Sequence, residues 1–330
     1  MAHARVRSIL QTEDQICCYR SITSAGVRVL WEITSACNLR CDFCLVEMKR
    51  QQIDLEHALC IADALVARKV DKVLLSGGEP LVFKGVEQVI RRLVEGGVLV
   101  KLLTNGTVEN EAVFRMIEAD PGFEVSLSIL SVQPEKADRI FRRPGAWARL
   151  CATLDRLPPR QLNIITACST DNEDEIEEII DWVAARGIPG ISVINVFKDP
   201  VSPARFRVDC RDYRIADDRA ERLRERLARK RAEYEGRLVI RTTQFWGGGG
   251  ESCGAGRSVL YIDALGRLLP CTLTDNRIWR ERTAGLDIGA AMDLYAREMP
   301  ALPASSCVRL LAAATSAAAP AATPAVVSAP

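Results

Sequence analysis

The sequence predicts an α/β fold built around a parallel sheet. Three observations predict it. First, short apolar runs with strand-like composition recur from about residue 29 to residue 197. Second, each run is followed by a segment whose apolar residues have helical spacing. Third, capping residues or glycines separate several of these strand-like and helix-like segments. Six such β-α units in a row imply parallel strands with right-handed crossovers, in a sheet that is either open or rolled into a partial barrel. Active sites in such sheets lie at the carboxyl ends of the strands.

The first strand is expected at Val29–Thr34, and a cysteine-rich loop follows it directly. Asp54 can cap the helix that comes next, and Asn172 can open a later helix that Gly187 closes. The other expected elements are the strands Val70–Ser76, Val98–Leu103, Phe123–Leu130, Leu162–Ala167 and Ile191–Phe197, and the helices around Val86–Leu93, Glu109–Ala119 and Ala146–Leu157.

The pattern changes after the sixth strand. Asp209–Glu235 is a charge-dense helical segment, for which a solvated connector is the simplest interpretation. Leu238–Thr243 has the composition of a short strand, and Val259–Asp263 and Arg267–Pro270 are expected to form a hairpin. The C-terminal stretch is rich in Ala, Pro and Ser and is expected to be disordered past Leu310.

Composition excludes several classes of function. A net charge of +1 argues against binding to a nucleic-acid backbone as the main activity. No apolar run approaches the roughly 20 residues of a membrane span, and the N-terminus lacks a signal-peptide core, so we expect a cytoplasmic protein without a membrane anchor. In that compartment thiols stay reduced, so twelve cysteines in uneven clusters indicate metal binding rather than disulfides.

The strongest motif lies in the loop after the first strand. Cys37, Cys41 and Cys44 have the spacing C-x3-C-x2-C. Three thiolates can hold three irons of a cubane cluster and leave the fourth iron open for a chelating ligand. A structural zinc site would need a fourth cysteine or histidine nearby, and the nearest histidine, His57, lies within an expected helix. The motif therefore predicts an iron–sulfur cluster.

Two further turns follow the next two strands. Gly77, Gly78, Glu79 and Pro80 form a Gly-Gly-Glu-Pro turn, in which the glycines let the backbone approach a ligand closely and Glu79 offers an acceptor. The third strand ends at Asn105, within Thr-Asn-Gly, which is equally compatible with an ordinary strand-ending turn.

The cysteine loop, with the aromatic Phe43 just before its last cysteine, resembles the radical S-adenosylmethionine (SAM) superfamily. The resemblance extends over about residues 29 to 200 and implies a partial (β/α)6 TIM-like barrel. It also implies a [4Fe–4S] cluster on Cys37, Cys41 and Cys44, with SAM chelating the open iron. In this family SAM is reductively cleaved to a 5′-deoxyadenosyl radical that abstracts a hydrogen from the substrate.

The same resemblance implies residues that contact SAM. The Gly-Gly-Glu-Pro turn would hold the methionyl ammonium, a serine after the fourth strand would meet the ribose, and an arginine near residue 142 would meet the carboxylate. Ser126 is an alternative to Ser128, Arg143 is an alternative to Arg142, and a solvated basic turn is the other interpretation of that segment. The expected cofactor-binding residues are Phe43, Gly77, Gly78, Glu79, Pro80, Asn105, Ser128 and Arg142.

A second cysteine group lies in the last third of the chain. Cys253, Gly266 and Cys271 have the spacing that opens the SPASM and twitch extensions of this superfamily, and the shorter twitch form is favoured because few cysteines remain. The resemblance implies an auxiliary [4Fe–4S] cluster on Cys253, Cys271 and Cys307. A non-cysteine group, a cysteine of the barrel or the substrate could supply the fourth ligand, and unconnected thiols are the alternative.

These observations divide the chain into five parts and suggest a substrate. The parts are an N-terminal extension (1–28), the radical SAM partial barrel (29–208), a helical connector (209–236), a small twitch-like domain (237–310) and an Ala/Pro-rich tail (311–330). The extension is too short for a separate domain that binds a leader peptide. We therefore expect a small polar substrate, such as a sugar-bearing intermediate of antibiotic biosynthesis, which would be decarboxylated or dehydrogenated.

That expectation rests on a likeness to cytosylglucuronic acid decarboxylases and to the twitch dehydrogenases of aminoglycoside pathways. No motif marks a catalytic residue for the step after hydrogen abstraction. A flavodoxin or ferredoxin is the expected one-electron donor. The alternatives are a maturase that modifies a ribosomal peptide and, from another class, a non-catalytic iron–sulfur protein in electron transfer or regulation.

Overall fold

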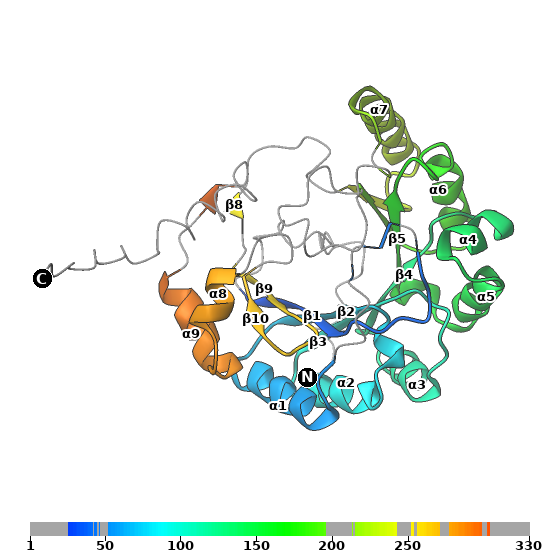
Figure 1. Cartoon of the computed structure of the whole chain (residues 1–330). Helices are drawn as coiled ribbons and strands as arrows, with labels where there is room; N and C mark the ends of the chain where they lie inside the picture. The colour runs from blue at the N-terminus through cyan, green and yellow to red at the C-terminus, as the bar shows by residue number, and fades with distance from the viewer. Residues whose placement is uncertain are drawn as a thin grey trace, which may run out of the picture.

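In the computed structural model of the chain, the described residues are 26–41, 43–44, 46, 52–195, 213, 215–242, 252–253, 256–270, 277–298 and 302–303. They form one curved sheet with helices along its outer face (Figure 1). The expected α/β fold with a parallel sheet is therefore confirmed, and the sheet is an open partial barrel because its two edge strands do not pair with each other.

The sheet has nine strands in the order β10-β9-β1-β2-β3-β4-β5-β6-β7. All neighbouring pairs are parallel except β9 and β10, which form an antiparallel hairpin. The strands are β1 (Arg28–Thr34), β2 (Lys72–Gly77), β3 (Leu99–Thr104), β4 (Glu124–Ser128), β5 (Leu162–Cys168), β6 (Gly190–Asn195), β7 (Val239–Thr242), β9 (Val259–Ile262) and β10 (Leu268–Leu269). A separate two-stranded sheet pairs β8 (Ser252–Cys253) with β11 (Leu302–Pro303).

The helices of the barrel largely follow the strands as the sequence predicts, with three additions and one correction. They are α1 (Leu55–Ala67), α2 (Val86–Glu95), α3 (Glu111–Ala119), α4 (Pro134–Phe141), α5 (Ala146–Arg156), α6 (Ile176–Ala185), α7 (Asp217–Glu233), α8 (Arg277–Arg282) and α9 (Ile288–Glu298). Asp54 caps α1 by accepting a hydrogen bond from the backbone of His57 at 2.8 Å, as expected. The helices α4, α8 and α9 were not expected.

Asn172 does not open α6, contrary to the expectation. Its amide nitrogen donates to the carbonyl oxygens of Leu130 at 2.8 Å and Ala167 at 3.0 Å. The side chain therefore joins the ends of two neighbouring strands, and α6 begins four residues later at Ile176.

The two faces of the sheet differ in polarity. Residues paired across parallel strands point to the same face. The outer face is apolar and packs beneath the helices; it carries Val29, Trp31, Ile33, Val73, Leu75, Val100, Leu102, Val125, Leu127, Ile164, Ile191 and Ile240. The inner face carries polar side chains in register, among them Lys72, Lys101, Glu124, Ser126, Asn163, Ser192 and Arg241.

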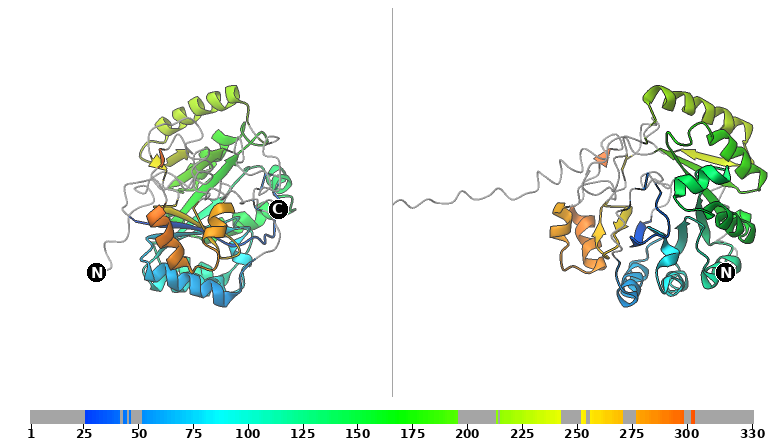
Figure 2. Two further views of the ribbon diagram at one scale, coloured as in Figure 1. Left: turned by 60° about the vertical axis from the view of Figure 1, so that its left-hand side comes forward. Right: turned by 45° about the vertical axis from the view of Figure 1, so that its right-hand side comes forward.

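Segments after the sixth strand extend the sheet on both sides. Strand β7 pairs with β6, and β9 pairs with β1, the strand that leads into the cysteine loop. Helix α7 lies over the same end of the sheet as α6 (Figure 2). Its Leu223 and Leu227 are buried, so the segment expected to be a solvated connector has one apolar face that packs on the fold. No helix within the described ranges is long and apolar enough to cross a bilayer.

Candidate functional site

The cysteine loop and the Gly-Gly-Glu-Pro turn are joined backbone to backbone at the carboxyl edge of the sheet. Gly78 donates its N–H to the carbonyl oxygen of Thr34 at 2.7 Å, and Glu79 donates its N–H to that of Ala36 at 2.9 Å. The Thr34 hydroxyl accepts the N–H of Ala36 at 3.0 Å, which tightens the start of the loop. The loop that carries Cys37 is therefore held in place by the end of β2.

Both glycines of this turn are required by that contact. A Cβ atom on Gly77 would lie 2.2 Å from the carbonyl oxygen of Thr34, and its φ of 134° is unfavourable for other residues. A Cβ atom on Gly78 would lie 2.2 Å from the carbonyl oxygen of Ala36 and 2.8 Å from that of Ser35. The glycines thus allow the turn after β2 to pack closely against the backbone of the cysteine loop, in addition to any approach of a ligand.

Glu79 is buried and joins the ends of β2 and β3. One carboxylate oxygen accepts hydrogen bonds from the Leu81 N–H at 3.0 Å and the Thr104 hydroxyl at 2.7 Å. The other accepts the N–H of Asn105 at 2.8 Å. Burial raises the pKa of Glu79 to about 7, although these three hydrogen bonds favour the ionised form. A cation placed beside this carboxylate would offset the cost of burying its charge. Pro80, the last residue of the motif, is buried in the short 3-10 helix Pro80–Val82.

The three cysteines of the loop are partly buried. Cys37, Cys41 and Phe43 pack against the edge of the core. The Cys37 sulfur accepts the N–H of Leu39 at 3.3 Å, and the N–H of Cys44 bonds the carbonyl oxygen of Cys41 at 3.2 Å. Burial raises the pKa of the Cys37 thiol to about 11, and the nearby Glu79 and Cys44 add to the rise.

This donor set fits a cubane better than a single metal ion. Within the described residues, no three His, Cys, Asp or Glu side chains converge on one ion position. A tetrahedral zinc site needs such convergence, with four ligands around one centre. A cubane takes one thiolate at each of several irons, so its cysteines are spread around a larger body. Three thiols on one loop, with no fourth such ligand beside them among the described residues, suit a cluster that keeps one iron open.

Two other expected SAM contacts lie near this loop or on the inner face. Phe141 accepts the N–H of Arg40 through its carbonyl oxygen at 3.2 Å, which places the following residue, Arg142, next to the cysteine loop. Arg142 is exposed and has a left-handed backbone with φ of 51° at the end of α4. Ser128 ends β4 on the inner face, half-buried, whereas the hydroxyl of Ser126 is fully buried and has no hydrogen-bond partner in the described part of the chain.

Apart from Ser126 and Ser128, the polar residues of the inner face were not expected from the sequence. Glu124 lies between two buried lysines, 3.0 Å from the Lys72 ammonium and 3.4 Å from that of Lys101. Arg241 of β7 donates to the Asn163 side chain at 3.2 Å. Polar residues at every second position of β4, in the run Glu-Val-Ser-Leu-Ser, were the available signal.

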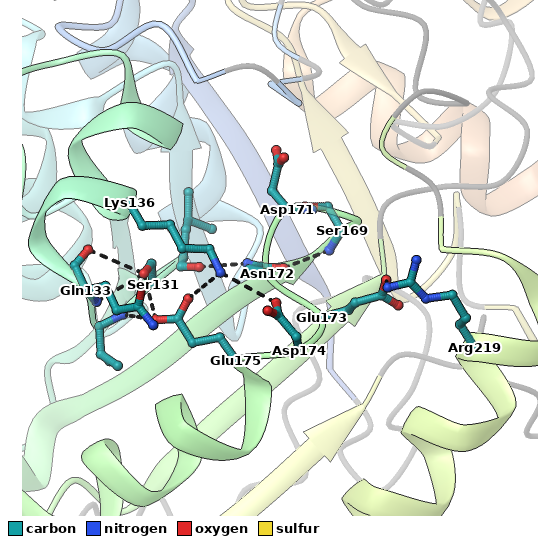
Figure 3. Close-up of polar contacts among 12 residues, drawn as sticks. Ser131, Gln133, Lys136, Ser169, Asp171, Asn172, Glu173, Asp174, Glu175 and Arg219 are labelled. Atoms are coloured by element: carbon teal, nitrogen blue, oxygen red, sulfur yellow. Dashed lines mark hydrogen bonds and ion pairs between the residues drawn. The ribbon is translucent and has the colours of Figure 1, made fainter.

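A further polar cluster joins the loop after β4 to the loop after β5 (Figure 3). Glu175 accepts hydrogen bonds from the Ser131 hydroxyl and the Val132 N–H, both at 2.7 Å, and lies 2.9 Å from the Lys136 ammonium. Glu173 forms an ion pair with Arg219 of α7. These contacts tie the loop after β4 to the loop after β5, and the loop after β5 to α7.

The segments that flank the C-terminal cysteines lie together. Cys253 pairs with Leu302 in the small sheet, and the N–H of Gly256 bonds the carbonyl oxygen of Pro270 at 3.1 Å. Cys271 follows Pro270 directly in the sequence. The expected ligands Cys271 and Cys307, and the side chain of Cys253, lie outside the described residues.

Comparison with known proteins identifies a radical SAM domain. Residues 31–183 match the Radical SAM superfamily. The chain is 25% identical over 274 residues to the AdoMet-dependent heme synthase of Methanosarcina barkeri, with 76% of this chain and 78% of that protein covered. It is 27% identical over 264 residues to the PqqA peptide cyclase of Rhizobium meliloti, with 74% of this chain and 66% of that protein covered.

Among solved structures, Streptococcus suis SuiB bound to the precursor peptide SuiA has the same fold, with a TM-score of 0.64 at 14% identity over 83% of this chain and 65% of SuiB. The chain thus spans about two thirds of the peptide cyclase and of SuiB. The family's cofactors are a [4Fe–4S] cluster and SAM. Residues 31–183 of the chain are therefore a radical SAM domain.

Proposed function

We propose that Cys37, Cys41 and Cys44 hold the [4Fe–4S] cluster and that the enzyme uses it to cleave SAM. The observation that carries this proposal is the loop itself: three partly buried thiols at the carboxyl edge of the sheet, hydrogen-bonded to a Gly-Gly-Glu turn. When bound, the cluster supplies one electron to SAM, and the resulting 5′-deoxyadenosyl radical abstracts a hydrogen atom from the substrate.

The residues around the loop would bind and orient SAM. Glu79 offers a buried carboxylate whose orientation is fixed by three hydrogen-bond donors. An ammonium group would therefore find an acceptor already in place. Arg142 lies next to the loop and suits a carboxylate. Ser128 and Ser126, whose hydroxyl has no hydrogen-bond partner among the described residues, are the candidates for the ribose. Phe43 and Pro80 would support the loop and the turn by packing.

The substrate would lie on the polar inner face. Parallel sheets covered on both faces carry apolar strands, so polar side chains such as Lys101, Glu124 and Asn163 indicate a face that meets a polar ligand. Two candidates follow. A peptide is supported by the similarity to the PqqA peptide cyclase and to peptide-bound SuiB. A small polar metabolite, sugar-bearing or not, is supported by the charged inner face alone.

The C-terminal cysteines would form a second centre in a twitch-like segment. The backbone contacts that join the surroundings of Cys253 and Pro270, and the pairing of Cys253 with Leu302, support one site for Cys253, Cys271 and Cys307. In this proposal an auxiliary [4Fe–4S] cluster accepts an electron from the substrate or binds the substrate directly. A flavodoxin or ferredoxin in the cytoplasm would reduce the first cluster.

Anaerobic reconstitution tests the proposal. Incubation with dithionite and SAM should release 5′-deoxyadenosine, and its absence from protein that holds a full cluster would favour a non-catalytic iron–sulfur protein. Parallel incubations with candidate precursor peptides and with sugar nucleosides should stimulate that release with one class only. The class of compound that stimulates the release identifies the substrate class. The product formed from that compound identifies the step that follows hydrogen abstraction.

A further inference from the structure

A closed ring of hydrogen bonds links the cysteine loop to the turn after β3. The Asn105 amide nitrogen donates to the side-chain oxygen of Asn38 at 3.0 Å, and the Asn38 amide nitrogen donates to the Thr107 hydroxyl at 2.8 Å. The Thr107 hydroxyl donates to the side-chain oxygen of Asn105 at 2.6 Å, which closes the ring. Each side chain in this ring, called here the amide ring, both donates and accepts.

The amide ring determines which way the Asn105 amide points. Its Oδ1 accepts from both the hydroxyl and the N–H of Thr107, the latter at 2.8 Å, so its Nδ2 must lie on the opposite side. That Nδ2 lies 3.7 Å from the sulfur of Cys37. The backbone N–H of Asn105 is held by Glu79 at 2.8 Å, so the residue is fixed through its backbone as well as its side chain.

A strand-ending turn would not need this arrangement. The Asn105 Oδ1 to Thr107 N–H bond by itself forms the usual Asx turn. Asn38, which belongs to the cysteine loop, and the contact of Nδ2 with Cys37 are additional. They place an amide donor on the sulfur of the first cysteine of the motif, in a part-buried position where a hydrogen bond is stronger than in water.

We propose that Asn105 is a positioning residue that donates a hydrogen bond to the Cys37 sulfur when this sulfur is a cluster ligand, and that Thr107 acts through it by orienting the amide. The inference rests on the proposed function, in which Cys37 ligates the cluster. Hydrogen bonds to cluster sulfurs stabilise the more negative, reduced state and so raise the reduction potential. Asn105 therefore makes the electron easier to deliver to the cluster from its donor.

The test compares the midpoint potential of four full-length reconstituted proteins: wild type, Asn105→Ala, Thr107→Val and Thr107→Ser. The potential is followed by electron paramagnetic resonance of the cluster whose signal changes when SAM is added. Asn105→Ala removes the donor, Thr107→Val removes the ring hydroxyl at nearly constant volume, and Thr107→Ser keeps that hydroxyl. Iron per chain is measured in each.

We expect Asn105→Ala and Thr107→Val to hold wild-type iron and to be harder to reduce by about tenfold, which for one electron is about 59 mV. Thr107→Ser should match wild type. Equal potentials in all four proteins would overturn the inference and leave the proposed function intact, and so would an equal shift in Thr107→Ser and Thr107→Val. If Asn105→Ala loses iron, the inference is tested by comparing the midpoint potentials of Thr107→Val and Thr107→Ser. A wild-type protein without a SAM-responsive cluster would instead refute the proposed function.

Discussion

Replacing Gly78 with alanine should displace the cysteine loop. The new Cβ atom would lie 2.2 Å from the carbonyl oxygen and 2.6 Å from the carbonyl carbon of Ala36, and 2.8 Å from the carbonyl oxygen of Ser35. All three are backbone atoms, so no side-chain rotation relieves the overlap. An ordinary contact of this kind begins near 3.4 Å, so the loop and the turn must separate by roughly 1 Å. The hydrogen bonds of Gly78 to Thr34 and of Glu79 to Ala36 would then lengthen or break.

The expected cost follows from these contacts. Overpacking of this size costs about 1–3 kcal/mol, and each of the two hydrogen bonds contributes about 0.5–1.5 kcal/mol more if lost. One kcal/mol lowers the Tm of a domain of 150–250 residues by about 2–4 °C, so the overlap alone predicts a fall of roughly 2–12 °C. Since Cys37 directly follows Ala36, iron per chain after reconstitution should also fall.

Gly122→Ala is the matched control. Its Cβ atom would meet only a side-chain oxygen of Asp120 at 3.3 Å, and Gly122 has no positive φ. Scanning calorimetry and iron analysis on both variants and on wild type measure the difference. If Gly78→Ala keeps the Tm and the iron content of Gly122→Ala, the loop is not held by the turn and the reasoning is refuted.

Three further predictions concern the cofactors. Changing Cys37, Cys41 and Cys44 to alanine should remove one cluster and abolish release of 5′-deoxyadenosine, and continued release would contradict the ligand assignment. Burial raises the pKa of Glu79 to about 7, so below that pH the carboxyl is mostly neutral and cannot pair with an ammonium. SAM affinity, measured by equilibrium dialysis, should therefore rise by up to about tenfold per unit between pH 5.5 and 7 and level off above, and Glu79→Gln should lose this slope. Reconstituted protein should hold about eight irons, falling to about four when Cys253, Cys271 and Cys307 are replaced, with SAM cleavage kept and substrate turnover lost; a wild type that never exceeds four irons would rule out the auxiliary cluster.

Much of the fold could be predicted because strands and helices alternate with clear periodicity. The β1 and β2 strands are within two residues of their expected bounds, and Asp54 caps α1 as expected. Asn172 was misassigned because a capping residue in the sequence does not say which backbone group its side chain meets. Here its amide nitrogen bonds two carbonyl oxygens. One belongs to Leu130, just after β4 and far away in sequence, and the other belongs to Ala167, across the turn that follows β5.

The candidate site could be proposed from the sequence where spacing within one loop carries the chemistry, as in the cysteine motif. It was not predictable where residues distant in sequence meet. The amide ring joins Asn38 to Thr107, and the inner face brings Lys72 to Glu124, through the order of strands in the sheet. The role of Gly78 in packing against Ala36 also depends on that order, because β1 and β2 must be neighbours.

The direction of β9 bears on how the two cysteine groups would work together. Strand β9 is parallel to β1, so its hairpin turn lies at the same edge of the sheet as the cysteine loop, and Gly266 in that turn lies beside His57 near the start of α1. Strand β10 then returns towards the opposite edge, where Pro270 bonds Gly256. The segments that lead to Cys253 and Cys271 therefore lie at the amino edge, and the polar inner face lies between them and Cys37. A substrate on that face would meet SAM at one end and the second centre at the other. This geometry explains why loss of the C-terminal cysteines should stop substrate turnover without stopping SAM cleavage.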